Sequence, residues 1–266
     1  TNPPAHIMGE GGFSFVVPTE FVELPSGGRH YHEGHPLHGE TAIEIKQMTA
    51  KEEDMLTSKT LLKKGVALDR VISSLIVNKT IDPDSLLVGD RNAIIVSTRV
   101  SAYGNDYTTK VGCPACGVTQ QYSFDLNSAN VYGGEDLGTV GTTDNGNGTF
   151  NIDLERTKVS VTFKLLTGRD EKAFLSGIEL DKKQRVDRNV TRQLSGMIVA
   201  VNGDSNPEAI KYLVHNMPSA DARHLRLAYR LTSPNIDLAQ HFECSECDHA
   251  QDMEVPLNAD FFWPDR

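Results

Sequence analysis

Two short cysteine motifs constrain this chain more than any other feature of its sequence. The motifs are CPACG at 113–117 and CSECD at 244–248, and they contain all four cysteines of the 266 residues. A CxxC turn supplies two thiolates to a metal ion, so two such turns complete a tetrahedral site. Strand-like sequence flanks both motifs, which places each at the tip of a β-hairpin. We therefore predict one structural zinc site, a ribbon assembled from distant halves, with the ligands Cys113, Cys116, Cys244 and Cys247.

Three other interpretations of these cysteines are weaker but stay open. A thioredoxin-like CxxC starts a helix, which lowers the pKa of its first thiol, whereas strand-like sequence follows both motifs here. Disulfides would need an oxidising compartment, and nothing at the N-terminus of the sequence resembles a secretory signal. Four unrelated buried thiols are the third alternative. The paired spacing favours zinc over all three.

The order of predicted elements repeats along the chain. Residues 19–127 read as a β-hairpin, a group of helices and a hairpin with the first CxxC motif, and residues 149–266 repeat this order to the second motif. Residues 1–18 are a predicted extended arm. Residues 128–148, rich in Gly, Asn, Thr and Asp, are a predicted linker that ends in the head of a hairpin. The predicted fold is α+β, with two pseudo-repeats joined by a shared four-cysteine zinc ribbon.

Local signals agree with this repeat. A capping box at Thr49–Glu52 predicts a helix start, and Thr167–Asp170 occupies the same place in the second half. Asp82-Pro83 and Asn206-Pro207 each predict a further helix start, because proline is favoured at the first helical position. Apolar residues at helical spacing between Val190 and Val201 predict another helix.

Composition and motifs limit the possible functions. Lys and Arg total 26 against 36 Asp and Glu, and the net charge of -10 opposes general affinity for phosphate backbones. No run approaches the roughly 20 apolar residues that would span a bilayer. No HExxH, GxSxG, Walker or Rossmann motif occurs. We therefore expect no enzymatic activity, no catalytic residues, and no nucleic-acid or membrane partner.

A loop rich in glycine and histidine, residues 25–40, raises the question of a second metal site. It contains four histidines within nine residues: His30, His32, His35 and His38. A metal site is one interpretation, and a solvated loop with incidental histidines is the other. No helical or strand spacing aligns the four rings, which favours the solvated loop.

Two apolar segments are candidate partner-binding surfaces. The arm has apolar residues without a helical period that would dock them on this fold, and such segments often become ordered on a neighbouring subunit. The C-terminal segment has three consecutive aromatic residues, which either anchor a partner or cover this protein's own sheet or ribbon; the second interpretation is favoured. The predicted partner-binding residues are Phe13, Phe15, Val16, Val17, Phe261, Phe262 and Trp263.

Three stretches resemble a known protein family. They are the segment from ELPSGGRHYHEGHPLH to ALDRVI at 23–72, CPACG at 113–117 and PLNADFFWP at 256–264. Together they are similar to the baseplate hub assembly protein family of T4-like contractile-tailed phages. The resemblance implies a non-enzymatic structural or assembly protein of the baseplate hub, which is assembled in the host cytoplasm, resides in the virion tail and binds other tail and baseplate proteins. A transient tail-assembly chaperone absent from the mature virion is the alternative. A zinc-ribbon nucleic-acid-binding protein is less favoured, because acidic residues flank the second motif.

Overall fold

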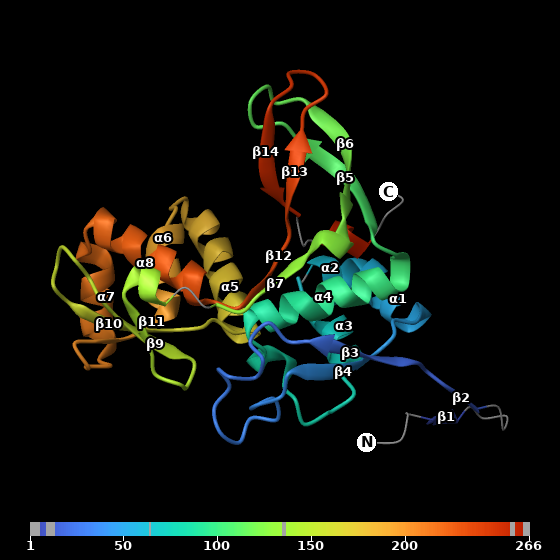
Figure 1. Cartoon of the computed structure of the whole chain (residues 1–266), viewed down its shortest axis with the longest axis horizontal. Coiled ribbons are helices and arrows are strands. Elements are labelled where there is room, and N and C mark those ends of the chain that lie inside the picture. Colours follow the sequence, from blue (N-terminus) through green and yellow to red (C-terminus); the bar gives the residue numbers. More distant parts are fainter. Residues whose placement is uncertain (1–5, 9–13, 64, 135–136, 256–258, 263–266) are drawn as a thin grey trace.

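The computed structural model describes residues 6–8, 14–63, 65–134, 137–255 and 259–262. In this part of the chain eight α-helices and several small antiparallel sheets form an α+β fold (Figure 1). No helix among these residues is both long and apolar enough to cross a membrane. One continuous core of buried apolar side chains joins elements from both halves of the sequence.

The first half begins with an arm and a hairpin and ends with the first cysteine motif. The arm hairpin consists of β1 (His6–Met8) and β2 (Ser14–Val16), and the next hairpin of β3 (Thr19–Glu23) and β4 (Ala42–Lys46). The helices are α1 (Ala50–Thr57), α2 (Lys59–Lys63), α3 (Ala67–Leu75), the 3-10 turn η1 (Pro83–Ser85) and α4 (Val88–Tyr103). Strands β5 (Asp106–Gly112) and β6 (Thr119–Asp125) follow. Alternate side chains of β4 and one face of α3 are buried, as a period of two and a helical period require.

The segment predicted as a linker contains short strands. Its elements are η2 (Leu126–Ser128), β7 (Asn130–Tyr132), η3 (Gly138–Val140) and β8 (Thr142–Asp144). Strand β7 pairs with β12 (Asn235–Asp237), and β8 forms a hairpin with β9 (Thr149–Asp153). Both pairings attach this segment to the second half of the chain.

The second half begins with a hairpin and ends with the second cysteine motif and a short 3-10 turn. Its elements are β9, β10 (Ser160–Lys164), α5 (Gly168–Gln184), α6 (Asn189–Met197), β11 (Ile198–Val201), α7 (Pro207–Asn216) and α8 (Ser219–Thr232). After β12 come β13 (Ala239–Glu243), β14 (Ala250–Glu254) and η4 (Ala259–Phe262). The helix predicted from Val190 to Val201 ends at Met197. The β-branched residues after it form β11, which pairs with β10.

Two local devices occur in both halves. A capping box opens α1 at Thr49 and another opens α5 at Thr167, as their spacing predicts. The third residue of α4 is Asp90, whose carboxylate accepts from the backbone N–H and hydroxyl of Ser26 at 2.9 and 2.7 Å. The third residue of α8 is Asp221. It accepts backbone N–H groups from the loop that follows β9, in the way that Asp90 binds the loop after β3.

The halves meet along the start of α4. The guanidinium of Arg91 bridges the carboxylates of Asp69 at 2.6 Å and Glu171 at 3.0 Å, which joins α4 and α3 to α5. The N–H of Val88 donates to the carbonyl of Leu166 at 3.0 Å. A side chain at Gly89 would place its Cβ only 2.0 Å from a backbone oxygen of the strand β12 region, so the close contact there requires glycine.

Candidate metal centre

The two cysteine hairpins stand side by side as one projection from the body (Figure 1). Hairpin β5–β6 carries Cys113 and Cys116, and hairpin β13–β14 carries Cys244 and Cys247. The Sγ atoms of Cys113 and Cys247 are 3.8 Å apart, and those of Cys116 and Cys244 are 3.7 Å apart. All four sulfur atoms lie within 4.8 Å of one another. The four cysteines therefore form a cluster that could hold a metal ion.

The two cysteine turns have the same backbone geometry. The N–H of Cys113 donates to the carbonyl of Val118, and the N–H of Cys244 donates to the carbonyl of His249. The residue after the second cysteine has a positive φ in both turns, 74° at Gly117 and 55° at Asp248. The first cysteine of each turn is buried and the second is exposed. Each turn thus presents its pair of thiols toward the other turn.

Protein groups favour a thiolate at one cysteine and oppose it at another. Backbone N–H groups, first that of Cys116 and also that of Ala115, hold the pKa of the Cys113 thiol at about 6 despite its burial. A backbone hydrogen bond from His249 lowers the pKa of Cys247, but partial desolvation of its thiol and the three neighbouring thiols outweigh it and raise that pKa to about 12. Four thiolates this close would repel one another. A bound cation would offset that repulsion and favour deprotonation of all four thiols, because metal ligation and deprotonation are coupled.

Side-chain amides connect the hairpins below the cysteines. The Gln120 amide donates to the carbonyl of Glu243 at 3.0 Å and accepts from the N–H of Ser245 at 3.0 Å. The Gln240 amide accepts from the N–H of Asp125 at 3.0 Å and donates to its carbonyl at 2.9 Å. The two amides connect β6 to β13, and these strands form no backbone hydrogen-bond ladder with each other. They position the two cysteine turns relative to each other.

An aromatic cluster supports the base of the projection. Phe261 and Phe262 are buried against this chain, and the rings of Phe261 and Tyr107 lie 4.9 Å apart. The fully buried guanidinium of Arg99 donates to three backbone carbonyls, including that of Phe261 at 2.9 Å. Burial lowers the pKa of Arg99. The aromatic end of the chain thus anchors the β5–β6 hairpin to α4.

The remaining residues predicted to bind partners lie in different environments. Phe15 and Val16 are 53% and 38% exposed on β2, whereas Val17 is buried. Phe13 and Trp263 lie outside the described residues. The structure thus leaves exposed two of the described apolar side chains of the arm.

The histidine-rich loop packs between the halves. The buried ring of His30 lies 5.6 Å from that of Phe150, and its Nδ1 is 3.9 Å from the Asp144 carboxylate. His35 binds the Ser85 hydroxyl at 2.8 Å. Among the described residues, the cysteines form the one cluster that could hold a metal, and the four histidines form none.

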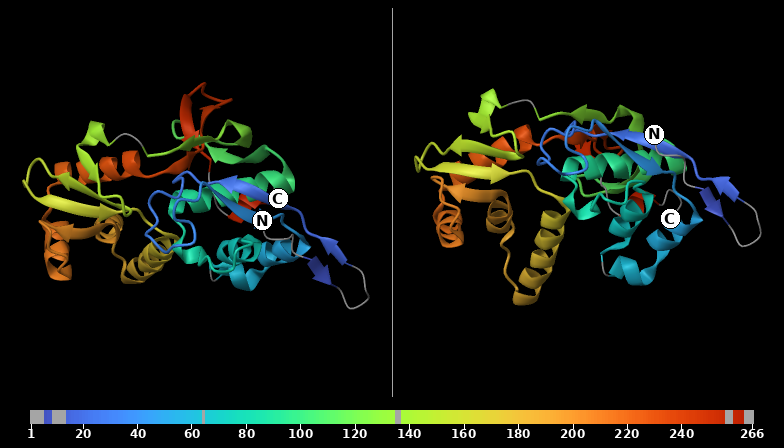
Figure 2. Two further views of the ribbon diagram at one scale, coloured as in Figure 1. Left: turned by 60° about the horizontal axis from the view of Figure 1, so that its bottom comes forward. Right: turned by 90° about the horizontal axis from the view of Figure 1, so that it is seen from below.

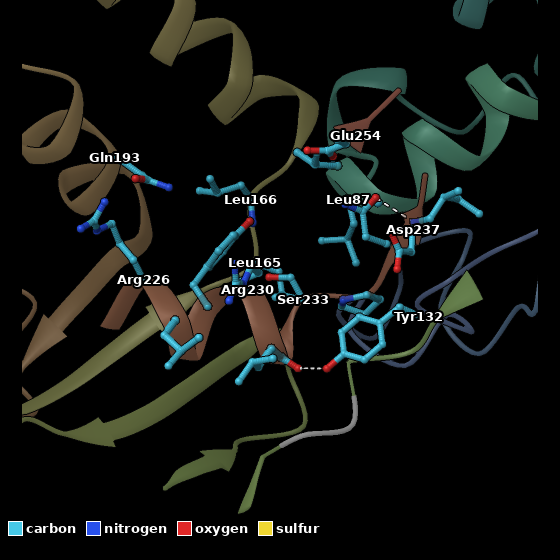
Figure 3. Close-up of a pocket in the computed structure, with 18 of the residues that line it drawn as sticks. Leu87, Tyr132, Leu165, Leu166, Gln193, Arg226, Arg230, Ser233, Asp237 and Glu254 are labelled. Atoms are coloured by element: carbon cyan, nitrogen blue, oxygen red, sulfur yellow. Dashed lines mark hydrogen bonds between the residues drawn. The ribbon is translucent and has the colours of Figure 1, made fainter. Parts of the chain in front are cut away.

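A cavity of about 920 Å³ lies beside α8 (Figure 3). One wall is a single face of α8 that carries Arg223, Arg226 and Arg230, none of which forms an ion pair within the described residues. Tyr132 from β7 also lines the cavity and donates a hydrogen bond to the carbonyl of Leu231 near the end of α8. This wall is therefore locally positive, although the chain as a whole has a net charge of -10.

A comparison with protein families identifies the family of this chain. The family described as "T4 bacteriophage base plate protein" matches residues 17–263. The chain belongs to this T4 base plate protein family. No curated protein and no solved structure matches the chain. The match to the T4 base plate family includes both cysteine hairpins and the aromatic cluster at their base, whereas residues 1–16 of the arm lie outside it.

Several residues of the centre could not be identified from the sequence. Gln120 and Gln240 are ordinary polar residues of strands, and Arg99 lies in a helix among apolar neighbours. Their roles depend on contacts with residues more than 100 positions away, such as the bond between Arg99 and Phe261. An arginine on an otherwise apolar helical face was the only available signal.

Proposed function

We propose that the four cysteines bind one zinc ion. In a regular tetrahedron, a Zn–S distance of about 2.3 Å corresponds to sulfur atoms about 3.8 Å apart. The cross-hairpin sulfur–sulfur distances of 3.8 Å (Cys113–Cys247) and 3.7 Å (Cys116–Cys244) agree with this. A closed set of four thiolates leaves no position for a substrate, which is typical of a structural site. The zinc ion would fix the ends of the two hairpins.

We also infer that the two halves arose by internal duplication and share one zinc ribbon. Support comes from the equal places of the capping boxes, of Asp90 and Asp221, and of the two cysteine turns. An experimental structure in which the β3–β4 and β9–β10 hairpins and the helices that follow them do not superpose would contradict this inference. The proposed boundaries are residues 19–127 and 149–266, with the arm at 1–18 and the linker at 128–148.

We propose that the protein is a non-enzymatic component of the phage baseplate hub that acts through protein–protein contacts. The observation that carries this proposal is the base plate family match over residues 17–263. The cluster of four cysteines supports a metal with a structural role, because four protein ligands leave no position for a substrate. Its partners would be other tail and baseplate proteins, and it would be assembled in the host cytoplasm and reside in the virion tail.

Quantitative mass spectrometry of purified virions tests this proposal. A structural component is expected in mature particles at a fixed copy number relative to other baseplate proteins. Its presence in infected cells together with absence from virions would instead support the transient assembly chaperone. Absence from both virions and tail-assembly intermediates would contradict a tail function.

Nucleic-acid binding is the remaining alternative, and the arginine wall of α8 provides a direct test. Loss of three cations at Arg223, Arg226 and Arg230 would weaken phosphate binding and reduce its salt dependence. We expect no binding of the wild-type chain to duplex DNA at physiological salt, because its net charge is -10. Salt-dependent binding that the triple alanine variant loses would contradict the proposal.

A further inference from the structure

Hairpins β3–β4 and β9–β10 are similar, but their edges differ. Strand β11 pairs with β10, where β4 has only a single bridge between Ile45 and Ile76 in the described part of the chain. In the second half, β8 pairs with the outer edge of β9, and the sheet has the order β11-β10-β9-β8. In the first half, β3 pairs only with β4 among the described residues. The position that β8 occupies beside β9 is therefore vacant beside β3.

The backbone of β3 has unpaired groups along this edge. The N–H of Leu24 donates to the carbonyl of Thr41, and in an antiparallel ladder every second residue of β3 faces β4 in the same way. The residues between them direct their N–H and C=O groups outward: Thr19, Phe21 and Glu23. No described residue forms a hydrogen bond with these outward backbone groups. At the equivalent edge of β9, the carbonyl of Thr149 accepts from the N–H of Asn145.

The side chains indicate what kind of partner would fit this edge. Phe21, in the middle of β3, is 73% exposed. An unpaired strand edge with an exposed apolar side chain is a template for an added strand, which gains backbone hydrogen bonds and a cross-strand contact. The partner is therefore an extended polypeptide segment rather than a small molecule.

The arm stands in the sequence directly before β3, where a strand equivalent to β8 would be expected. Strand β8 directly precedes β9, and β2 directly precedes β3. The turn between β8 and β9 uses positive φ angles at Gly146 and Gly148, 73° and 78°, to reverse the chain. Between β2 and β3 there are only Val17 and Pro18, which disfavour a positive φ. The arm therefore continues away from the body and does not fold back onto its own β3 (Figure 2).

The arm would be stabilised by pairing with a further strand. It consists of the two-stranded hairpin β1–β2, and such a hairpin is marginally stable by itself. Phe15 and Val16 are exposed on β2, beyond the core of the body. Pairing with a third strand would satisfy one edge of the hairpin and cover these side chains.

We propose that the arm of one copy of this chain pairs with the β3 edge of a second copy, and that reciprocal exchange holds the copies together. The arm is the favoured occupant because its counterpart β8 fills this position in the second half. The outward backbone groups of Thr19, Phe21 and Glu23 gain partners, and Phe21 gains an apolar neighbour. Reciprocal exchange produces a closed two-fold assembly. This inference depends on the proposed equivalence of the halves but not on the zinc site.

Sedimentation velocity of the 266-residue chain over a wide concentration range tests the exchange. We expect wild-type protein at twice the 29.2 kDa of one chain. Phe21→Pro removes the outward N–H without removing a hydrogen bond to β4, and Phe21→Lys adds a charge to the edge. Both variants, and a chain that lacks residues 1–16, are expected to sediment as single copies. Tyr212→Lys changes an equally exposed aromatic residue on α7 and is expected to assemble as wild type does.

A mixing experiment distinguishes the arm from the edge. The chain without residues 1–16 keeps the edge, and the Phe21→Pro chain keeps the arm, so the two together are expected to form a one-to-one complex although neither self-associates. Circular dichroism establishes that each variant is folded, and Phe21→Lys replaces Phe21→Pro if proline unfolds the hairpin. A single-copy wild type, assembly that survives the Phe21 substitutions, or a mixture that stays separate would overturn the exchange. A zinc-loaded single copy would overturn it and leave the proposed function intact.

Discussion

At the scale of single residues, glycine at position 117 avoids the backbone strain that a side chain would meet in the first cysteine turn. Its φ is 74°, and a Cβ there would contact nothing within 4 Å, so any cost of a side chain comes from the backbone alone. We expect Gly117→Ala to lower the free energy of unfolding by about 1 kcal/mol. Gly112→Ala, on the adjacent strand and equally free of contacts, is expected to have no such cost. Denaturant unfolding of both variants measures the difference, and equal costs would contradict the strain argument.

His30 makes stability depend on pH. Burial lowers its pKa below the ordinary value of 6.5, and the nearby Asp144 carboxylate offsets this only in part. The unfolded chain therefore binds a proton that the folded chain does not, and stability is full above about pH 6.5 and decreases as the pH falls below it. We expect His30→Gln to reduce the loss of thermal stability between pH 7 and 5. The exposed His32→Gln is the control, and an equal effect of both substitutions would contradict this role.

At the scale of elements, Gln120 links the two cysteine hairpins. It bonds to Glu243 and Ser245 across the interface, whereas Gln251, at the same place in the second hairpin, bonds to His249 of its own hairpin. We expect Gln120→Ala to destabilise the protein by about 1 kcal/mol, since a hydrogen bond contributes about 0.5–1.5 kcal/mol net. Gln251→Ala should cost less, about 0.5 kcal/mol or below. A larger cost at Gln251 in thermal melts would contradict the linking role.

The aromatic end of the chain is part of the core. Phe261 is fully buried against Tyr107, and we expect Phe261→Ala to cost about 3–5 kcal/mol through lost burial and the cavity left behind. Tyr212→Ala removes a side chain that is 74% exposed and should change stability by less than about 0.5 kcal/mol. A stable Phe261→Ala protein that fails only in assembly would show that this end binds a partner instead.

The elements that could be predicted depend on short-range signals. Capping boxes, proline at helix starts and the CxxC turns act within a few residues, so their places could be predicted from the sequence. The helix predicted up to Val201 instead ends at Met197, because β11 gains a ladder with β10 that no local pattern encodes. Pairing of β7 with β12 and the contacts of Gln120 likewise depend on residues far along the chain.

At the scale of the whole molecule, two groups of contacts between the halves lie far apart. The cysteines of the two halves meet at the tips of the projection, and the ion pairs of Arg91 with Asp69 and Glu171 join the halves at α4. We therefore expect Cys113→Ser to release the metal and to increase hydrogen exchange most in β5, β6, β13 and β14. Exchange in α3, α4 and α5 should change little. Unfolding of the whole chain would contradict this separation.

Zinc K-edge X-ray absorption of the purified chain, with the metal content of the same sample, tests the central claim most directly. We predict one zinc per chain with four sulfur neighbours at about 2.3 Å. This result requires Cys113, Cys116, Cys244 and Cys247 to act together, as their positions at the tips of the two hairpins imply. Nitrogen or oxygen neighbours in place of sulfur, or protein prepared without chelators that contains no zinc, would contradict the account.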